Sequence, residues 1–108
     1  MAQYDDETLY LHALYMQVLL IQIACDAIAH IAYATGDDAI VEQFCDQVAS
    51  TPIEGLVVSK RKGSTPIRDN LARAITKRRM RTELLPTLRT AGARALAHRK
   101  AKDRTNGQ

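Results

Sequence analysis

The run from Leu9 to Tyr33 constrains the fold of this chain more than any other feature. It is apolar or small at nearly every position and contains neither Gly nor Pro, a composition that favours a helix. At about 100° per residue, four of its five polar side chains fall on one narrow strip and Gln17 lies off it. The five are His12, Gln17, Gln22, Asp26 and His30. A helix that is apolar around the rest of its circumference has to be buried on almost every side.

A helix from Asp6 to Thr35 would be about 45 Å long at 1.5 Å per residue. A compact domain of about 100 residues has a radius of gyration of only about 13 Å. One short chain can hardly cover such a rod, so we expect a homodimer in which a second copy covers part of this long buried helix. The predicted dimer interface consists of Leu14, Val18, Ile21, Cys25 and Ile28.

The same run is long enough to span a membrane, but its charges argue against that interpretation. Asp26 would cost about 2.5–3.5 kcal/mol within a bilayer. Both flanks are acidic and no Lys or Arg precedes Lys60, so the positive-inside pattern is missing. A signal peptide would need a basic start and a small-residue cleavage site, which are also missing. We therefore expect a cytoplasmic protein with no membrane segment.

Charge is divided sharply between the two halves of the chain. Residues 1–55 hold nine acids and no Lys or Arg, a net charge of −9, whereas residues 56–108 hold all fifteen bases and three acids, a net charge of +12. Such asymmetry favours a surface for nucleic acid or another polyanion. The alternative is that the halves neutralise each other across the fold.

The two cysteines, Cys25 and Cys45, lie among apolar residues. Free Cys in such surroundings behaves as a small hydrophobe, and two cysteines fit a reducing compartment better than a disulfide framework. A bridge between them, joining the first two helices, is the open alternative.

Local signals divide the acidic half into a helical hairpin. Asp5 or Asp6 can cap the first helix, and Gly36 can end it. Asp37 or Asp38 then caps a second helix at about 39–49. Its apolar stripe is Ile40, Val41, Phe44, Cys45 and Val48, and its polar face is Glu42, Gln43, Asp46 and Gln47.

The basic half predicts two further helices. Residues 53–59 form a possible short edge strand, and a basic loop follows. Thr65 and Pro66 mark a helix start, and the third helix runs to about Arg81 with Ile67, Leu71, Ala74 and Ile75 on one side. Because Pro86 would kink a helix, we expect a break near Thr82 and a fourth helix over 83–100. Its buried face is Leu84, Leu85, Leu88, Ala91, Gly92, Ala95 and Leu96.

The predicted fold is therefore all-α, with four helices in a single domain over residues 1–100. Residues 1–55 form an acidic oligomerisation hairpin and residues 60–100 a basic helical half. Residues 101–108 have no large apolar side chain and are expected to be a disordered tail.

The basic cluster around residues 77–81 is the strongest functional signal. Its cations sweep more than one helical turn, and together with neighbouring bases they could follow a phosphate backbone. The predicted nucleic-acid-binding residues are Lys60, Arg61, Lys62, Arg73, Lys77, Arg78, Arg79, Arg81, Arg89 and Arg94. All aromatic residues precede Lys60, so stacking on single-stranded bases is disfavoured and a duplex is the expected ligand. The two helices around Thr82 loosely resemble a helix-turn-helix, but the turn lacks Gly.

No residue pattern indicates catalysis, a cofactor or a metal. Asp26 and His30 are four residues apart on the polar strip, and a hydrogen-bonded buried pair is the expected reading, with a metal ligand pair across a dimer axis as the alternative. No combination of Ser, Cys, His and acidic residues has the context of a catalytic site, so we do not expect an enzyme.

Two functions are consistent with these features. The first is a small dimeric regulator that binds duplex DNA through its basic helix. The second is a protein-binding adaptor, or a phage-type inhibitor of a nucleic-acid enzyme, that acts through protein contacts. In the second case the acidic half would dock on a basic partner through Asp37, Asp38, Glu42 and Asp46.

Overall fold

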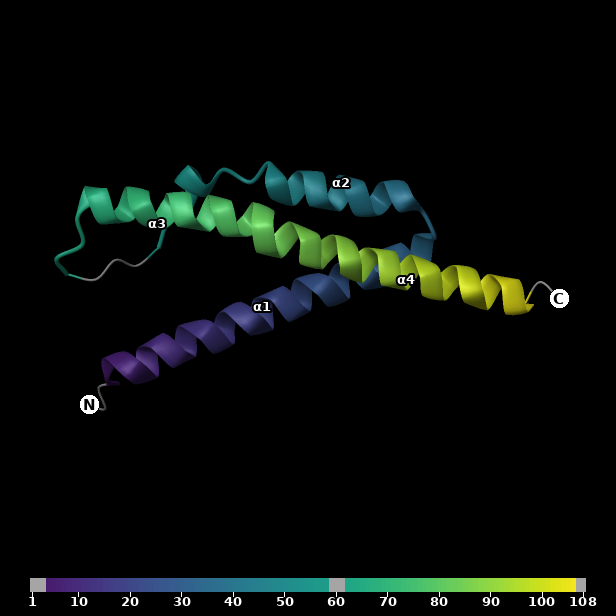
Figure 1. The fold of residues 1–108 in the computed structure, drawn as a ribbon, viewed down its shortest axis with the longest axis horizontal. Helices are drawn as coiled ribbons and strands as arrows, with labels where there is room; N and C mark the ends of the chain where they lie inside the picture. Colours follow the sequence, from purple (N-terminus) through teal and green to yellow (C-terminus); the bar gives the residue numbers. More distant parts are fainter. Residues whose placement is uncertain (1–3, 59–61, 107–108) are drawn as a thin grey trace.

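The structure is a computed structural model that describes residues 4–58 and 62–106. Within these ranges every regular element is helical (Figure 1). The chain runs through α1 (Asp6–Thr35), α2 (Asp38–Ala49), the 3-10 turn η1 (Ile53–Gly55), α3 (Pro66–Arg79), the π-helical segment η2 (Met80–Leu84) and α4 (Leu85–Asn106). The all-α prediction is confirmed for this part of the chain.

Both ends of α1 have the caps that the sequence predicts. Asp5 accepts a hydrogen bond from the Thr8 N–H at 2.7 Å, and the hydrogen bonds from Thr8 lower the pKa of the Asp5 carboxyl. Gly36 ends the helix with a φ of 67°, a left-handed conformation that suits Gly, and its N–H donates to the Ala32 carbonyl. α2 then begins after Asp37, whose side chain accepts from the Ala39 N–H at 2.9 Å. Local capping therefore sets the α1–α2 hairpin.

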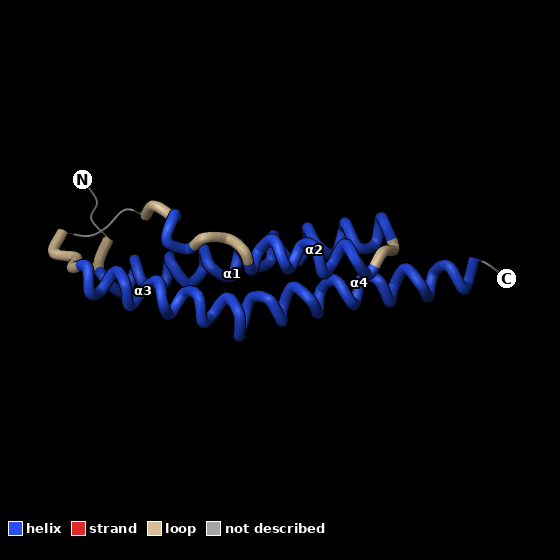
Figure 2. The backbone as a smooth tube through the Cα atoms, turned by 90° about the horizontal axis from the view of Figure 1, so that it is seen from above, coloured by secondary structure: helices blue, strands red, loops and turns tan. Residues whose placement is uncertain are grey.

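The predicted break near Thr82 is wrong, because α3, η2 and α4 form one continuous helix (Figure 2). In the π-helical segment the Leu85 N–H donates to the Met80 carbonyl, five residues earlier. This wider turn accommodates Pro86, which lacks an N–H and would crowd the carbonyl four residues before it in a regular α-helix. The described part of the chain therefore has three helical rods rather than four, and no helix-turn-helix occurs at this position.

Two further predictions for the basic half are also wrong. Residues 53–58 form η1 and an extended segment without strand pairing, and Ser59 lies outside the described residues. The expected disordered tail is helical as far as Asn106, because α4 continues with Ala101 and three charged side chains that can extend the helix in solvent. Only residues 107 and 108 of that tail lie outside the described part.

The core lies where the C-terminal half of α1 meets α2 and α4. It contains Ile28, Ala32, Val41, Cys45, Leu85, Leu88 and Leu96. Each face predicted to be apolar in α2 and α4 is buried or half-buried, and the four predicted polar residues of α2 are exposed. Gly92 is buried too, and a Cβ built on it would lie 2.8 Å from Val41 Cγ1. α2 and α4 therefore pack closely at this point because position 92 has no side chain.

The N-terminal half of α1 diverges from α3, so that the molecule is an open V at that end (Figure 1). The extents of the chain are 64 × 31 × 19 Å and its radius of gyration is 18.3 Å, well above the value of a compact chain of this length. Of α1, only Ile28 and Ala32 are fully buried within one chain, and Val18 is 64% exposed. The long helix is thus uncovered by its own chain over its first half.

Candidate nucleic-acid interface on the basic helix

The continuous helix formed by α3, η2 and α4 carries most of the positive charge. From Pro66 to Asn106 it is about 60 Å long. It holds twelve Lys and Arg and three Asp and Glu, a net charge of +9. Because the break at Thr82 does not occur, these cations lie along one continuous helix rather than around a turn.

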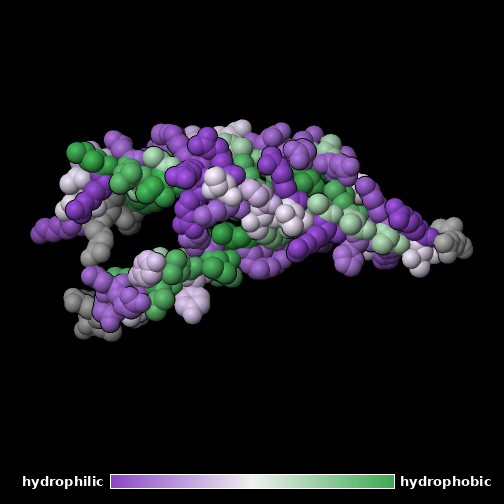
Figure 3. Space-filling view, viewed as in Figure 1, coloured by the Kyte–Doolittle hydropathy of each residue, from purple (hydrophilic) through white to green (hydrophobic). Residues whose placement is uncertain are grey.

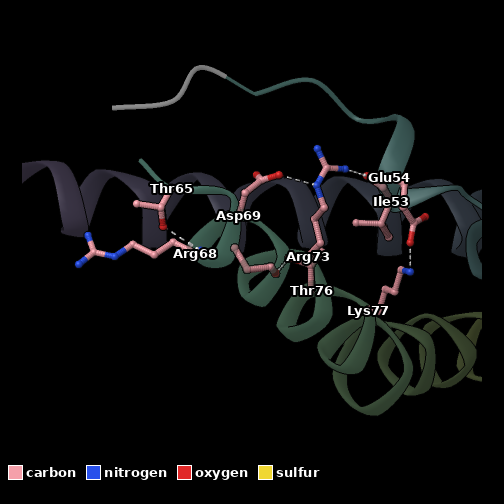
Figure 4. Close-up of polar contacts among 9 residues, drawn as sticks. Ile53, Glu54, Thr65, Arg68, Asp69, Arg73, Thr76 and Lys77 are labelled. Carbon is pink, nitrogen blue, oxygen red and sulfur yellow. Dashed lines mark hydrogen bonds and ion pairs between the residues drawn. The ribbon is translucent and has the colours of Figure 1, made fainter. Parts of the chain in front are cut away.

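Two of the predicted nucleic-acid-binding residues attach η1 to α3 (Figure 4). Arg73 Nε lies 3.0 Å from Asp69 Oδ2, and another guanidinium nitrogen of Arg73 donates to the Ile53 carbonyl at 2.9 Å. Lys77 forms an ion pair with Glu54. Arg73 is less accessible to a phosphate than Lys77, since its side chain is only 25% exposed. These contacts hold the connection after α2 against the basic helix.

Three other cations pair with carboxylates while remaining about half exposed. Arg79 Nε lies 2.9 Å from Glu83, and Arg89 Nε lies 3.6 Å from Glu42 of α2. Lys100 Nζ lies 3.9 Å from Asp38 at the start of α2. The two halves thus neutralise each other in part. Exposed ion pairs contribute about 0–1 kcal/mol, so a phosphate could replace these carboxylates at small cost.

A second set of cations has no carboxylate within ion-pair distance among the described residues. All of its members are exposed: Lys62, Arg68, Arg78, Arg81, Arg94, Lys102 and Arg104. Four of them belong to the predicted nucleic-acid-binding set, namely Lys62, Arg78, Arg81 and Arg94. The predicted residues Lys60 and Arg61 lie outside the described part. We call Arg68, Arg78, Arg81, Arg94 and Arg104 the unpaired arginines.

Sequence reasoning missed Arg68 and Arg104 as members of this surface. Arg68 lies in the first turn of α3, well before the basic cluster of residues 77–81, so the sequence pattern does not link it to that cluster. Arg104 falls in the predicted disordered tail, although Lys and Arg continue past Lys100 in residues that favour helix. That continuation was the signal that could have extended the basic helix to Asn106.

Arg99 has a structural role that the sequence analysis did not assign. Its guanidinium donates to the Tyr33 carbonyl at 2.7 Å and to the Ala34 carbonyl at 2.6 Å. α1 has no basic residue in its last turn, so its last carbonyls need a donor from elsewhere. Arg99 supplies both that donor and a positive charge at the negative end of the helix dipole. It therefore joins the C-terminal end of α1 to α4.

Two residues of the polar strip of α1 face an open groove of about 640 Å³ between α1 and α4. Gln22 and Asp26 line it from α1, and Thr90, Arg94 and His98 line it from α4. Asp26 accepts a hydrogen bond from Gln22 at 3.2 Å. The expected Asp26–His30 pair does not form in the described chain, and both residues are exposed. No group of three or more His, Cys, Asp or Glu that could hold a metal occurs in the described ranges.

Cys25 and Cys45 are free thiols, so the bridge between them is not formed. Burial raises the pKa of both thiols, and the neighbouring Asp26 carboxylate raises that of Cys25 further. Arg89 opposes the rise for Cys45. Both cysteines therefore serve as packing residues, in line with their apolar surroundings.

The predicted dimer-interface residues fall into three groups in the structure. Leu14 and Val18 are exposed on the free half of α1. Ile21 and Cys25 are half-buried at the vertex of the V. Ile28 is fully buried in the core of its own chain, so a second copy could not reach it.

No protein-family model, curated protein or solved structure matches this chain. By length and composition, α1 could cross a membrane. That feature is weak evidence, since the core helix of a soluble protein has the same length and composition. Its C-terminal half contacts the charged helix α4 and the hairpin partner α2, which are protein surfaces rather than lipid.

Proposed function

We propose that this protein binds duplex nucleic acid through the exposed cations of its continuous basic helix. The observation that supports the proposal best is the set of five unpaired arginines, spread from Arg68 to Arg104 along a single rod of net charge +9. A cation that has no carboxylate partner of its own releases condensed counterions when it meets a phosphate. The paired and exposed cations, such as Arg79 and Arg89, would add to that contact.

The expected mode of binding is along the phosphate backbone. The described part of the basic half has no aromatic residue on which single-stranded bases could stack. A continuous helix also cannot present the two crossed helices of a helix-turn-helix. Contacts to phosphates alone give affinity without sequence preference, so we expect little discrimination between duplexes of different sequence.

We further propose that the chain acts as a homodimer, as its uncovered α1 suggests. Leu14 and Val18 are exposed apolar residues on a helix that has to bury most of its circumference. A dimer would carry two basic rods and double the positive field seen by a duplex.

The test is a titration of a fluorescent duplex at two salt concentrations. A triple variant, Arg78→Ala, Arg81→Ala and Arg94→Ala, removes unpaired cations. A matched triple variant, Arg79→Ala, Arg89→Ala and Lys100→Ala, removes three cations that already have carboxylate partners. Both variants lower the net charge by three, and the matched variant also releases Glu83, Glu42 and Asp38 from their ion pairs.

Loss of three phosphate contacts should reduce the slope of log affinity against log salt by about 2.7. We expect this reduction in the first triple variant and a smaller one in the matched variant. An unchanged affinity in the first variant, or equal losses in both, would refute binding through the unpaired arginines.

A protein-binding function is the second candidate, but the structure changes the surface that would carry it. Asp38 and Glu42 pair with Lys100 and Arg89, and Asp37 caps α2, so few carboxylates of the acidic surface remain for a basic partner. The exposed apolar half of α1 is the observation that favours a protein contact. A chain that shows no duplex binding at physiological salt, yet is folded, would point to this second candidate.

A further inference from the structure

The open end of the molecule holds an apolar groove between the free half of α1 and the basic helix. It has a volume of about 670 Å³ and is lined from α1 by residues such as Met16 and Leu20, and from the other wall by Ile75 and Leu84. Figure 3 shows hydrophobic side chains on both arms where they part. Beyond Ile75, Leu71 and Ile67 continue the apolar stripe of α3 at intervals of four residues, and Ile67 is 81% exposed.

We propose that the free half of α1 from a second copy occupies this groove, and that the exchange is reciprocal. This inference rests on the proposed homodimer and specifies how the two copies meet. In a two-fold dimer the same patch serves on both subunits, so each arm would enter the groove of the other. The groove and the arm that would fill it are then both covered by a single interface.

The arm suits a groove with two walls because it is apolar on several sides. α2 and α3 each have one apolar stripe, whereas α1 is apolar around most of its circumference. The arm is also about as long as the opposite wall, since Asp6–Ile23 and α3 with η2 each extend about 27 Å. A second copy therefore brings a helix of the right length and character.

The exposed apolar area of the two arms is of the same order as the apolar share of a standard interface. Full burial of a large aliphatic side chain is worth about 1.5–3 kcal/mol, or about 60–120 Å² at 25 cal/mol per Å². Met16, Leu20 and Ile75 line the groove itself. With their neighbours on the two arms they make a set of eight large hydrophobic side chains that are 39–81% exposed: Leu9, Tyr10, Leu14, Met16, Leu20, Ile67, Leu71 and Ile75. Two copies would bury about 500–1,000 Å² of apolar surface. The apolar share of a standard interface is about 900 Å².

Charge favours an antiparallel arrangement of the two arms. The tip of α1 is acidic, with Asp5, Asp6 and Glu7, and it has no base. If the two-fold axis passes near Leu14, the tip of one arm lies beside Ile21 of the other. Ile21, Arg79 and Glu83 line the same groove, so the acidic tip would approach a guanidinium that it would share with Glu83.

The mass of the purified chain in solution gives the first test. We expect twice the 12.0 kDa of a single chain by light scattering. Leu20→Asp places a carboxylate on the groove wall in both copies and should weaken dimerisation by at least about 100-fold, because an unpaired charge is costly to bury. Val57→Asp is the matched control, since Val57 is 96% exposed and lies outside the groove, and it should leave the mass unchanged.

Disulfide trapping tests the arrangement itself. An antiparallel axis near Leu14 sets Tyr10 of one arm opposite Gln17 of the other, so chains with Tyr10→Cys mixed with chains with Gln17→Cys should form crosslinked heterodimers. Tyr10→Cys alone should crosslink poorly, because the two Cα atoms would lie further apart than the roughly 7 Å that a disulfide spans. Strong crosslinking of Tyr10→Cys to itself would show a parallel pair and refute the proposed arrangement.

Other occupants of the groove give distinct results. A monodisperse mass of 12.0 kDa at about 100 μM would mean that the groove takes no second copy. Flotation with vesicles of phosphatidylcholine and phosphatidylglycerol, without a dimer, would assign the arm to a lipid surface. Duplex binding is measured on Leu20→Asp in parallel. A monomeric wild type that still binds duplex refutes the homodimer and this inference but leaves duplex binding in place, whereas a dimer without duplex binding refutes the duplex-binding function and leaves this inference in place.

Discussion

A methyl group added at Gly92 should destabilise the fold through a clash with one neighbour. A Cβ at this position would lie 2.8 Å from Val41 Cγ1 and 2.9 Å from Val41 Cγ2, closer than carbon atoms approach in proteins. Both residues are buried, and Val has a stiff χ1 angle on a helix, so Val41 cannot rotate away. The Gly92→Ala substitution therefore forces α2 and α4 apart.

The magnitude follows from two opposing effects. Replacing Gly by Ala in a helix gains about 1 kcal/mol of stability, whereas overpacking a core costs about 1–3 kcal/mol. Because Val41 cannot move away, we take about 3 kcal/mol for the overpacking cost. After the helix gain of about 1 kcal/mol is subtracted, Gly92→Ala should lower the free energy of unfolding by about 2 kcal/mol. Val41→Ala alone should cost about 2 kcal/mol from the lost methyl groups and the cavity.

The double variant should be more stable than either single variant. Val41→Ala opens the space that the new Cβ needs, and the helix gain at position 92 remains. We expect a loss of only about 1 kcal/mol, which gives a coupling energy of about 3 kcal/mol between the two sites. Urea unfolding followed by circular dichroism at a fixed chain concentration measures all four proteins.

Gly55→Ala is the control for the effect of Gly itself. A Cβ at Gly55 would meet only Pro52 Cγ at 3.8 Å, an ordinary contact, so this variant should be neutral or slightly more stable. Equal stability of Gly92→Ala and wild type, or simple additivity in the double variant, would refute the close packing of α2 on α4.

The remaining predictions concern Arg99 and the two thiols. Arg99→Ala should lower the free energy of unfolding by about 2–3 kcal/mol, because two charge-assisted hydrogen bonds to carbonyls at the end of α1 are lost; Arg99→Lys should recover part of it, and urea unfolding will decide. Cys45 is 1% exposed and Cys25 half-buried, so iodoacetamide at pH 8 should label Cys25 first, and both more slowly than in urea. Their pKa values are raised in the folded state, so their contribution to stability is present below the usual thiol value of 9.0 and is lost as pH rises through the folded value. Equal labelling rates in the folded and unfolded chains would contradict the burial of Cys45.

Local features of this sequence predict local structure well. The bounds of α1, its Asp5 and Gly36 caps, and the start of α3 at Thr65 and Pro66 are as expected, because each depends on residues within one turn. The buried faces of α2 and α4 were also predicted correctly, since a regular period of apolar residues identifies them.

What the sequence could not predict depends on geometry between elements. A Pro in a helical pattern is normally a boundary, and only a π-helical turn allows Pro86 to lie inside a helix. Ion pairs such as Lys77–Glu54 join residues far apart in the chain, so a list of cations could not separate the paired from the unpaired. The role of Arg99 could not be predicted for the same reason, because the carbonyls that accept its hydrogen bonds belong to Tyr33 and Ala34 of α1.

The π-helical segment also changes the direction in which the side chains of α4 point relative to those of α3. A π turn holds one residue more than the turns around it, and so shifts the phase of everything downstream by about a quarter of a revolution. Without that shift, the stripe of Ile67, Leu71 and Ile75 would be centred about 70° from Leu85 and Leu88, on the same side of the helix. With the shift, Leu85 and Leu88 of α4 face the core. The aliphatic side chains of α3 point in another direction, where they stay exposed within one chain.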